Sequence, residues 1–206
     1  MKPHVQFDLM TIHKGTREYT YRGIPCIKCP FDFAIYQMIV HRCRPDLIIE
    51  IGTFSGGSAL YLSDLMKVNG IEGEVHTIDL PGNKPQGAFK PDNIRYFNEG
   101  FEGYDLKNAA GFGRVMVIDD GSHYPWDVSD AFQKFHGLVT PTQYYIIEDG
   151  VISHWEWTDF DGGPVGTIER IFDDERYEDK FRIDWQMCNF FGHNATFNMN
   201  GYLVRL

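Results

Sequence analysis

Two acidic clusters stand out among the residues whose chemistry could serve catalysis. The first reads DDGSH over 119–123, and the second reads EDG over 148–150. Carboxylates that converge without a cation would repel one another and would be costly to desolvate. Oxygen ligands of this kind suit a hard divalent ion, Mg²⁺ before Ca²⁺ or Mn²⁺. We therefore expect Asp120, Glu148 and Asp149 to bind a divalent cation.

His123 lies three residues beyond Asp120, close enough to take a proton from a group held on the metal. Imidazole titrates near neutral pH and therefore suits a general base. We expect His123 and Asp120 to be the catalytic residues. Alone, the first cluster could be an aspartate that caps a turn and a histidine with only local contacts. Its combination with the second cluster favours the catalytic interpretation.

A glycine-rich segment supplies a second candidate site. Glu50 stands two residues before Gly52, and the chain continues TFSGGS to Ser58. Glycine permits a tight turn, and the N-terminus of a following helix offers free N–H groups and partial positive charge. The segment lacks both the GxGxxG fingerprint and the P-loop lysine. Glu50 would repel a phosphate but suits an amino group, so an amino acid moiety fits better. The alternative is an ordinary strand–helix turn.

Asp79 ends a second apolar, alternating segment, EVHTIDL over 74–80. In dinucleotide-binding folds an acid at this place accepts hydrogen bonds from a ribose diol. Asp79, Glu50 and the glycines together favour an adenosyl amino acid as the ligand. The alternative for Asp79 is a turn or helix cap.

The elements that must position these residues alternate along the chain. Residues 1–30 are expected to be irregular, and 81–93 to form a loop. Strands are expected at 47–51, 74–80, 94–97, 114–118, 144–147, 181–183 and 202–205, and helices at 31–43, 58–68, 125–138 and 165–172. Strands separated by helices indicate a mostly parallel sheet with helices on both faces. The ligand should lie at the carboxyl ends of the strands, where the strand order reverses.

Composition and charge narrow the functional classes. The 206 residues are 43% hydrophobic and carry a net charge of −10, which indicates one domain with a full core. The acidic balance disfavours nucleic acid, and no basic amphipathic or long apolar segment indicates a membrane. No secretory signal is visible, so we expect a cytoplasmic protein. Cys26 and Cys29 form a C-x-x-C without a second pair of zinc ligands, and we expect free thiols.

At these motifs the sequence resembles class I S-adenosylmethionine-dependent O-methyltransferases. Within them it is similar to the cephalosporin hydroxylase/rhamnosyl O-methyltransferase family, and its metal motif resembles that of the macrolide sugar O-methyltransferases. The resemblance extends from about residue 20 to the C-terminus. The matching segments are Gly23-Ile24-Pro25 with Lys28, Pro30 and Asp32, then 44–53 with 56–59, then 118–123, 145–149 and 201–203.

This resemblance implies a Rossmann-like fold with a seven-stranded, mostly parallel sheet. Residues 1–44 would form an N-terminal helical extension or lid and 45–206 the core of one domain. It implies methyl transfer from S-adenosylmethionine to a hydroxyl of a sugar, glycoside or phenol, with Mg²⁺ bound and His123 as the base. The residues assigned to the cofactor are Glu50, Gly52, Thr53, Gly56, Ser58, Asp79 and Asp119, and those assigned to the metal are Asp120, Glu148 and Asp149.

Two rival functions remain open on the same fold. One is a metal-dependent hydroxylase, which three carboxylates disfavour because iron oxygenases prefer two histidines and one carboxylate. The other is a cofactor-binding partner subunit without turnover, which would not need a base such as His123. A homo-oligomer is compatible with all of these functions.

Overall fold

The computed structural model describes residues 8–83, 85, 91–155, 158–177 and 179–206. A seven-stranded sheet with the order β5-β4-β3-β6-β7-β9-β8 forms its centre. The strands are β3 (Leu47–Ile51), β4 (Glu74–Ile78), β5 (Ile94–Phe97), β6 (Val115–Asp119), β7 (Tyr144–Ile147), β8 (Phe181–Ile183) and β9 (Tyr202–Arg205). β5, β4, β3, β6 and β7 are parallel to one another, whereas β9 runs antiparallel to both of its neighbours. The sheet is therefore mostly parallel, as the sequence pattern predicts.

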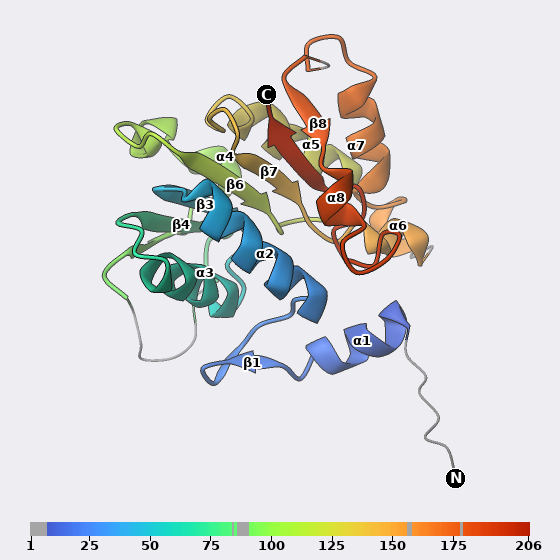
Figure 1. Ribbon diagram of the computed structural model, residues 1–206, viewed down its shortest axis with the longest axis horizontal. Helices are drawn as coiled ribbons and strands as arrows, with labels where there is room; N and C mark the ends of the chain where they lie inside the picture. The colour runs from blue at the N-terminus through green and yellow to red at the C-terminus, as the bar shows by residue number, and fades with distance from the viewer. Residues whose placement is uncertain (1–7, 84, 86–90, 156–157, 178) are drawn as a thin grey trace.

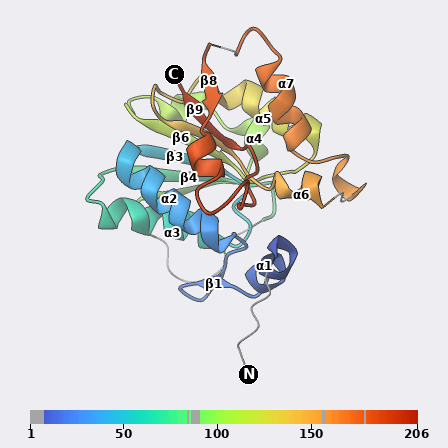
Figure 2. The same cartoon turned by 45° about the vertical axis from the view of Figure 1, so that its right-hand side comes forward.

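Helices cover both faces of the sheet. α2 (Pro30–Cys43) and α3 (Gly57–Val68) lie on one face, while α5 (Pro125–Phe135) and α7 (Val165–Phe172) lie on the other (Figures 1 and 2). Successive strand residues point to opposite faces, so the core divides into two clusters. In β3, for example, Ile48 packs with α2 and α3, whereas the next residue packs with α5. The long helices and all seven strands confirm the predicted architecture.

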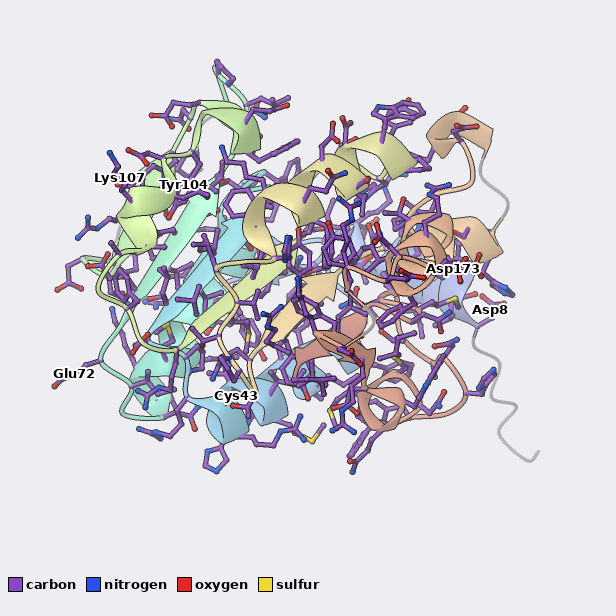
Figure 3. All side chains as sticks on the ribbon, turned by 90° about the horizontal axis from the view of Figure 1, so that it is seen from above. Asp8, Cys43, Glu72, Tyr104, Lys107 and Asp173 are labelled. Carbon is purple, nitrogen blue, oxygen red and sulfur yellow. The ribbon has the colours of Figure 1, made fainter. Side chains whose placement is uncertain are left out.

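Several single-turn elements have no counterpart in the predicted pattern, because they are too short to show periodicity. They are α4 (Gly100–Gly103), η1 (Leu106–Ala109), α6 (Val151–His154), η2 (Thr158–Phe160) and α8 (Trp185–Cys188). In the view of Figure 3, Tyr104 lies in the packed interior, whereas the side chain of Lys107 extends away from the ribbon. Several predicted bounds also shift: α2 and α3 each begin one residue earlier, β4 ends at Ile78, β6 moves by one residue, and α5 ends at Phe135.

The N-terminal segment is not irregular, and that expectation is wrong for the described part, from residue 8 onward. α1 (Leu9–Thr16) begins at Asp8, whose carboxylate accepts the N–H of Thr11. A hairpin of β1 (Thr20–Tyr21) and β2 (Ile24–Pro25) follows. Figures 1 and 2 show α1 and β1 set apart from the sheet. We name residues 8–29 the N-terminal arm.

The cysteines and the lengths of the helices bear on two further expectations. All four cysteines are free, and Cys26 and Cys29 are buried, so the C-x-x-C is neither a disulfide nor part of a described metal cluster. None of the helices in the described part of the chain is long and apolar enough to span a membrane. Of the loop predicted over 81–93, residues 84 and 86–90 lie outside the described residues, and the rest contains neither helix nor strand.

Candidate active site

The strand order reverses between β3 and β6, and the segments that follow these two strands meet there. Gly52 has a φ of +99°, and a Cβ at this position would lie 2.0 Å from the carbonyl oxygen of Asp120. Only glycine tolerates both that backbone angle and that approach. Close backbone packing at Gly52 therefore brings the glycine-rich segment against the first acidic cluster. This contact lies where the strand order reverses, which is the place predicted for the ligand.

Two adjoining cavities open at this point. The inner cavity has a volume of about 250 Å³, and the residues lining it include Lys28, Thr53, Ser58, Asp120, His123 and Asp149. The outer cavity has a volume of about 500 Å³, and its lining includes Asp79, Leu80 and Phe101. Gly52, Phe54, Asp120 and Gly121 line both. An elongated ligand with two chemically different ends could therefore occupy them together.

Glu50 is a predicted cofactor residue whose buried carboxylate lacks a hydrogen-bond donor for one oxygen among the described residues. Its side chain is fully buried; Oε2 accepts a hydrogen bond from the Thr77 hydroxyl at 2.6 Å, whereas Oε1 has no hydrogen-bond partner among the described residues. A buried carboxylate oxygen without a donor is costly. An ammonium group that donates to Oε1 would remove this cost, so Glu50 fits the amino end of S-adenosylmethionine. Thr53 hydrogen-bonds to the same Thr77 hydroxyl at 2.7 Å.

Asp79 lines the outer cavity and holds the turn after β3 to the turn after β4. Its Oδ2 accepts the Phe54 N–H at 2.8 Å, and its Oδ1 accepts the Leu80 N–H and the Asn83 side chain, both at 2.7 Å. A carboxylate offers about four acceptor sites, so a ribose hydroxyl could still bind. Phe54, which sequence reasoning did not single out, lines both cavities with φ at +47° and an exposed fraction of 60%.

Three of the predicted cofactor residues line neither cavity: Glu50, Gly56 and Asp119. Gly56 lies against Pro85, whose Cβ would be 3.0 Å from a Cβ at that position. Asp119 is buried on the face of the sheet opposite to Asp120, where it accepts hydrogen bonds from the Gly121 N–H and the Tyr145 hydroxyl. Alternation along β6 explains this difference, because consecutive residues of a strand point to opposite faces.

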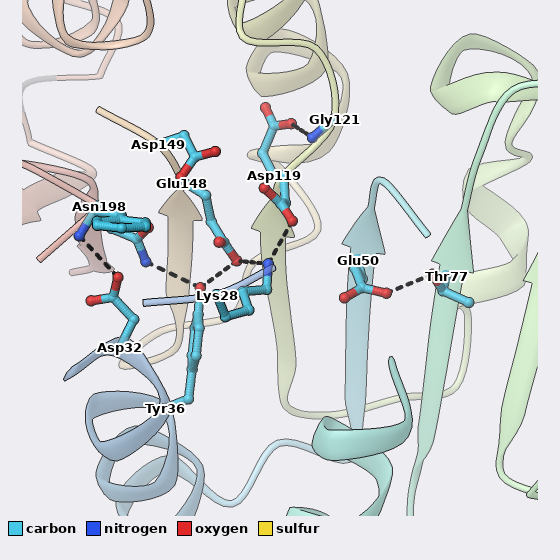
Figure 4. A network of polar contacts seen from close by, with 12 residues as sticks. Lys28, Asp32, Tyr36, Glu50, Thr77, Asp119, Gly121, Glu148, Asp149 and Asn198 are labelled. Atoms are coloured by element: carbon cyan, nitrogen blue, oxygen red, sulfur yellow. Dashed lines mark hydrogen bonds and ion pairs between the residues drawn. The ribbon is translucent and has the colours of Figure 1, made fainter. Parts of the chain in front are cut away.

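Lys28 of the N-terminal arm reaches into the site and was given no role by the sequence. Its Nζ lies 2.5 Å from Asp120 Oδ2 and 2.6 Å from Glu148 Oε1 (Figure 4). The side chains of Lys28 and Glu148 are 5% and 3% exposed. Burial alone would lower the pKa of Lys28, but the two carboxylates outweigh burial and hold its pKa well above the ordinary value. Lys28 therefore stays an ammonium ion at neutral pH.

A buried hydrogen-bond network fixes Glu148 from the other side (Figure 4). The Tyr36 hydroxyl donates to Glu148 Oε1 at 2.6 Å and accepts from Asn198 at 3.2 Å. Asn198 also donates to the Tyr202 hydroxyl, which in turn donates to Asp32 at 2.8 Å. Asp32 is thus part of the support of the site. Sequence reasoning missed this network, because its members are far apart in the chain.

Asp120, His123 and Asp149 form a group that could hold a metal ion. Each can offer one ligand atom, and these atoms lie within 4.8 Å of one another. Asp149 has a φ of +56°, a left-handed conformation that aspartate tolerates. Glu148 does not belong to this group, since its Oε1 faces Lys28 instead. Two of the three predicted metal ligands thus lie together, with the predicted base as the third member.

His123 lines the inner cavity beside Asp149. Its Nε2 lies 3.4 Å from Asp149 Oδ2, and its ring packs against Phe160 with a centroid distance of 5.4 Å. Burial lowers the pKa of His123 below the ordinary value. The imidazole is therefore neutral near pH 7 and has a lone pair available to accept a proton.

Asp119 leads to a prediction about pH and stability. Burial raises its pKa to about 8, whereas the unfolded chain has an aspartate pKa of about 3.9. The folded state then binds the proton more tightly, so this contribution to stability is complete below about pH 4 and is lost as pH rises through 8. Between pH 5 and 7 Asp119 lowers the unfolding free energy of the wild type by about 1.4 kcal/mol for each unit of rising pH. Asp119→Asn should remove this part of the decline.

Urea denaturation in EDTA at several pH values measures this decline. Asp130→Asn is the matched control, because Asp130 is exposed on α5 and should leave the slope unchanged. An equal slope in wild type and Asp119→Asn would contradict the assignment.

Comparison with known proteins agrees with the fold. The family described as Rhamnosyl O-methyltransferase/CmcI matches residues 13–92 and 105–206. A rhamnosyl O-methyltransferase of Mycobacterium tuberculosis is 30% identical over 195 residues, which cover 90% of this chain and 78% of that protein. The Mycobacterium leprae protein of the same name is 28% identical over 196 residues, which cover 90% of this chain and 82% of that protein.

Solved structures share the fold at lower identity. CmcI with Mg and S-adenosylmethionine has a TM-score of 0.66 at 23% identity, covering 92% of this chain and 77% of that one. MycE with Mg, S-adenosylhomocysteine and mycinamycin VI has a TM-score of 0.53 at 20% identity, covering 71% and 44%. These structures confirm the Rossmann-like class I methyltransferase fold. The chain belongs to the rhamnosyl O-methyltransferase/CmcI family and is an S-adenosylmethionine-dependent O-methyltransferase.

Proposed function

We propose that this enzyme methylates a hydroxyl group of a sugar or glycoside with the help of a divalent cation, Mg²⁺ first. The observation that carries this proposal is the position of Asp120, His123 and Asp149 beside the glycine-rich segment, in one cavity. The methyl donor and the acceptor hydroxyl can therefore meet at the same place. Relatives named for a rhamnosyl acceptor, and a MycE structure with mycinamycin VI, support a glycoside as the acceptor class.

The residues present fit both the cofactor and the metal. Glu50 would accept the ammonium of S-adenosylmethionine, and Asp79 would accept its ribose hydroxyls. Asp120 and Asp149 would hold the cation. Glu148, which the sequence also predicts as a ligand, faces Lys28 in this structure. A divalent cation bound there would lower the pKa of an acceptor hydroxyl and orient a sugar diol.

His123 would then act as the general base. Its neutral imidazole accepts the hydroxyl proton, and the acceptor oxygen forms a bond to the methyl carbon while the carbon–sulfur bond of the donor breaks. The carboxylate of Asp149, 3.4 Å from His123 Nε2, stabilises the imidazolium that forms. Alignment of the oxygen, methyl carbon and sulfur supplies up to roughly 7–11 kcal/mol of the rate enhancement.

Mass spectrometry of acceptor reactions tests the proposal. The protein, S-adenosylmethionine and Mg²⁺ are incubated with a methyl rhamnoside, other hexosides and a catechol, and with deoxy analogues that lack one hydroxyl of the diol. We expect S-adenosylhomocysteine and a product that gains one CH₂ from a diol, and a strong loss of rate with the deoxy analogue. Gain of an oxygen atom would favour the hydroxylase alternative. Cofactor binding in calorimetry without any methylated product would favour the partner-subunit alternative.

A further inference from the structure

We propose that Lys28 is a built-in counter-cation that competes with a divalent ion for the charge of Asp120 and Glu148, and thereby sets how tightly the metal binds. This inference rests on the proposed function, because it concerns the same cation site. It adds a residue of the N-terminal arm to the machinery of the enzyme, as a positioning residue and not a catalytic one.

The arm delivers the ammonium of Lys28 from a fixed backbone. The N–H of Cys26 donates to the Tyr19 carbonyl at 3.1 Å, which closes the chain before Lys28. A Cβ at Gly57 would lie 2.4 Å from the Pro25 carbonyl oxygen, so α3 packs directly on the arm. α2 begins two residues after Lys28, at Pro30. The Lys28 side chain is buried in this arrangement, and buried charges require partners.

The charges of the site explain why the ammonium is needed and why it competes. Asp120, Glu148 and Asp149 would carry three negative charges when ionised, and Lys28 supplies one positive charge. The remaining excess equals the charge of one divalent cation. Lys28 forms ion pairs with Asp120 Oδ2 and with Glu148 Oε1. Glu148 is therefore not part of the group that could hold a metal ion. A metal ion held by Asp120 would therefore share that carboxylate with the fixed positive charge of Lys28, which would lower its affinity.

Titration calorimetry with MgCl₂ on Lys28→Met tests this competition, because methionine keeps much of the apolar stem and removes the charge. We expect the dissociation constant for Mg²⁺ to fall at least about tenfold. The rise in melting temperature caused by Mg²⁺ should also be larger than in wild type, since the metal-free variant has unbalanced carboxylates. Lys67→Met is the matched control: Lys67 is exposed and 3.7 Å from the exposed Asp92, so neither quantity should change.

Lys28→Arg keeps the charge and should gain no Mg²⁺ affinity. If Lys28→Met folds only when Mg²⁺ is present, the same competition is shown in a stronger form. If Lys28→Met binds Mg²⁺ no more tightly than wild type, or folds no better with it, the proposal is overturned.

The same Mg²⁺ titrations distinguish a failure of the proposed function from a failure of the inference about Lys28. Absence of Mg²⁺ binding in wild type would remove the metal from the proposed function. A Mg²⁺ site that then arises in Lys28→Met would still support the competition, and no site in either protein would overturn both.

Discussion

Replacing His123 with alanine should slow methyl transfer by about 10²–10⁴-fold, the usual contribution of a positioned general base. The affinity for S-adenosylmethionine should stay that of wild type, because Glu50 and Asp79 hold the two ends of the cofactor in our proposal. Single-turnover rates, with cofactor affinity from calorimetry, measure the two quantities separately. A variant that methylates at the wild-type rate would rule out His123 as the base.

Mg²⁺ affinity distinguishes a base from a metal ligand at this position. His123 belongs to the group that could hold a cation, so a ligand role would predict weaker Mg²⁺ binding in His123→Ala. A base role predicts unchanged Mg²⁺ binding and the loss of the acidic limb of the pH–rate profile. His154→Ala is the matched control, because His154 is exposed and lines a different cavity with Phe31 and His193.

The sequence was sufficient for the parts of the site that follow directly from strands. Gly52, Asp79 and Asp120 each come after or at the end of a predicted strand, and parallel strands bring such positions to one edge of the sheet. The long elements were predictable for a similar reason, since helices and buried strands of several residues repeat their apolar pattern. The short α1 and α8 offered no such repeat.

The same reasoning could have separated Asp119 from Asp120. Asp119 is the last residue of β6 and Asp120 follows it, and alternation along a strand sends neighbouring side chains to opposite faces. Only one of the two can therefore face the cofactor cavities, and that residue is Asp120. Assigning Asp119 to the cofactor treated the acidic pair as one unit.

Lys28 and Glu148 could not be paired from the sequence, because 120 residues separate them along the chain. The partnership depends on where the arm crosses the end of the sheet, a tertiary feature without a local pattern. In this structure Glu148 lies against the ammonium of Lys28, whereas His123 lies beside Asp120 and Asp149.

Asp149→Asn should weaken Mg²⁺ binding by more than the roughly 10–100-fold that loss of an outer-shell partner of a metal site costs. The amide has nearly the size of the carboxylate and tolerates the left-handed backbone at this position, so the fold should remain intact. Methyl transfer should fall at low Mg²⁺ and recover in part as the Mg²⁺ concentration rises. EDTA should abolish transfer in wild type, and added Mg²⁺ should restore it.

Asp161→Asn is the control for backbone effects, because Asp161 is exposed and has a φ of +47°, also in the left-handed region. It should leave Mg²⁺ affinity and transfer unchanged. Wild-type Mg²⁺ affinity in Asp149→Asn would show that the metal, if bound, lies elsewhere, and full activity in EDTA would show that transfer needs no metal. Mg²⁺ affinity is the deciding readout for Asp149, because Asp149 also contacts the His123 imidazole, whereas Asp120 also pairs with the ammonium of Lys28.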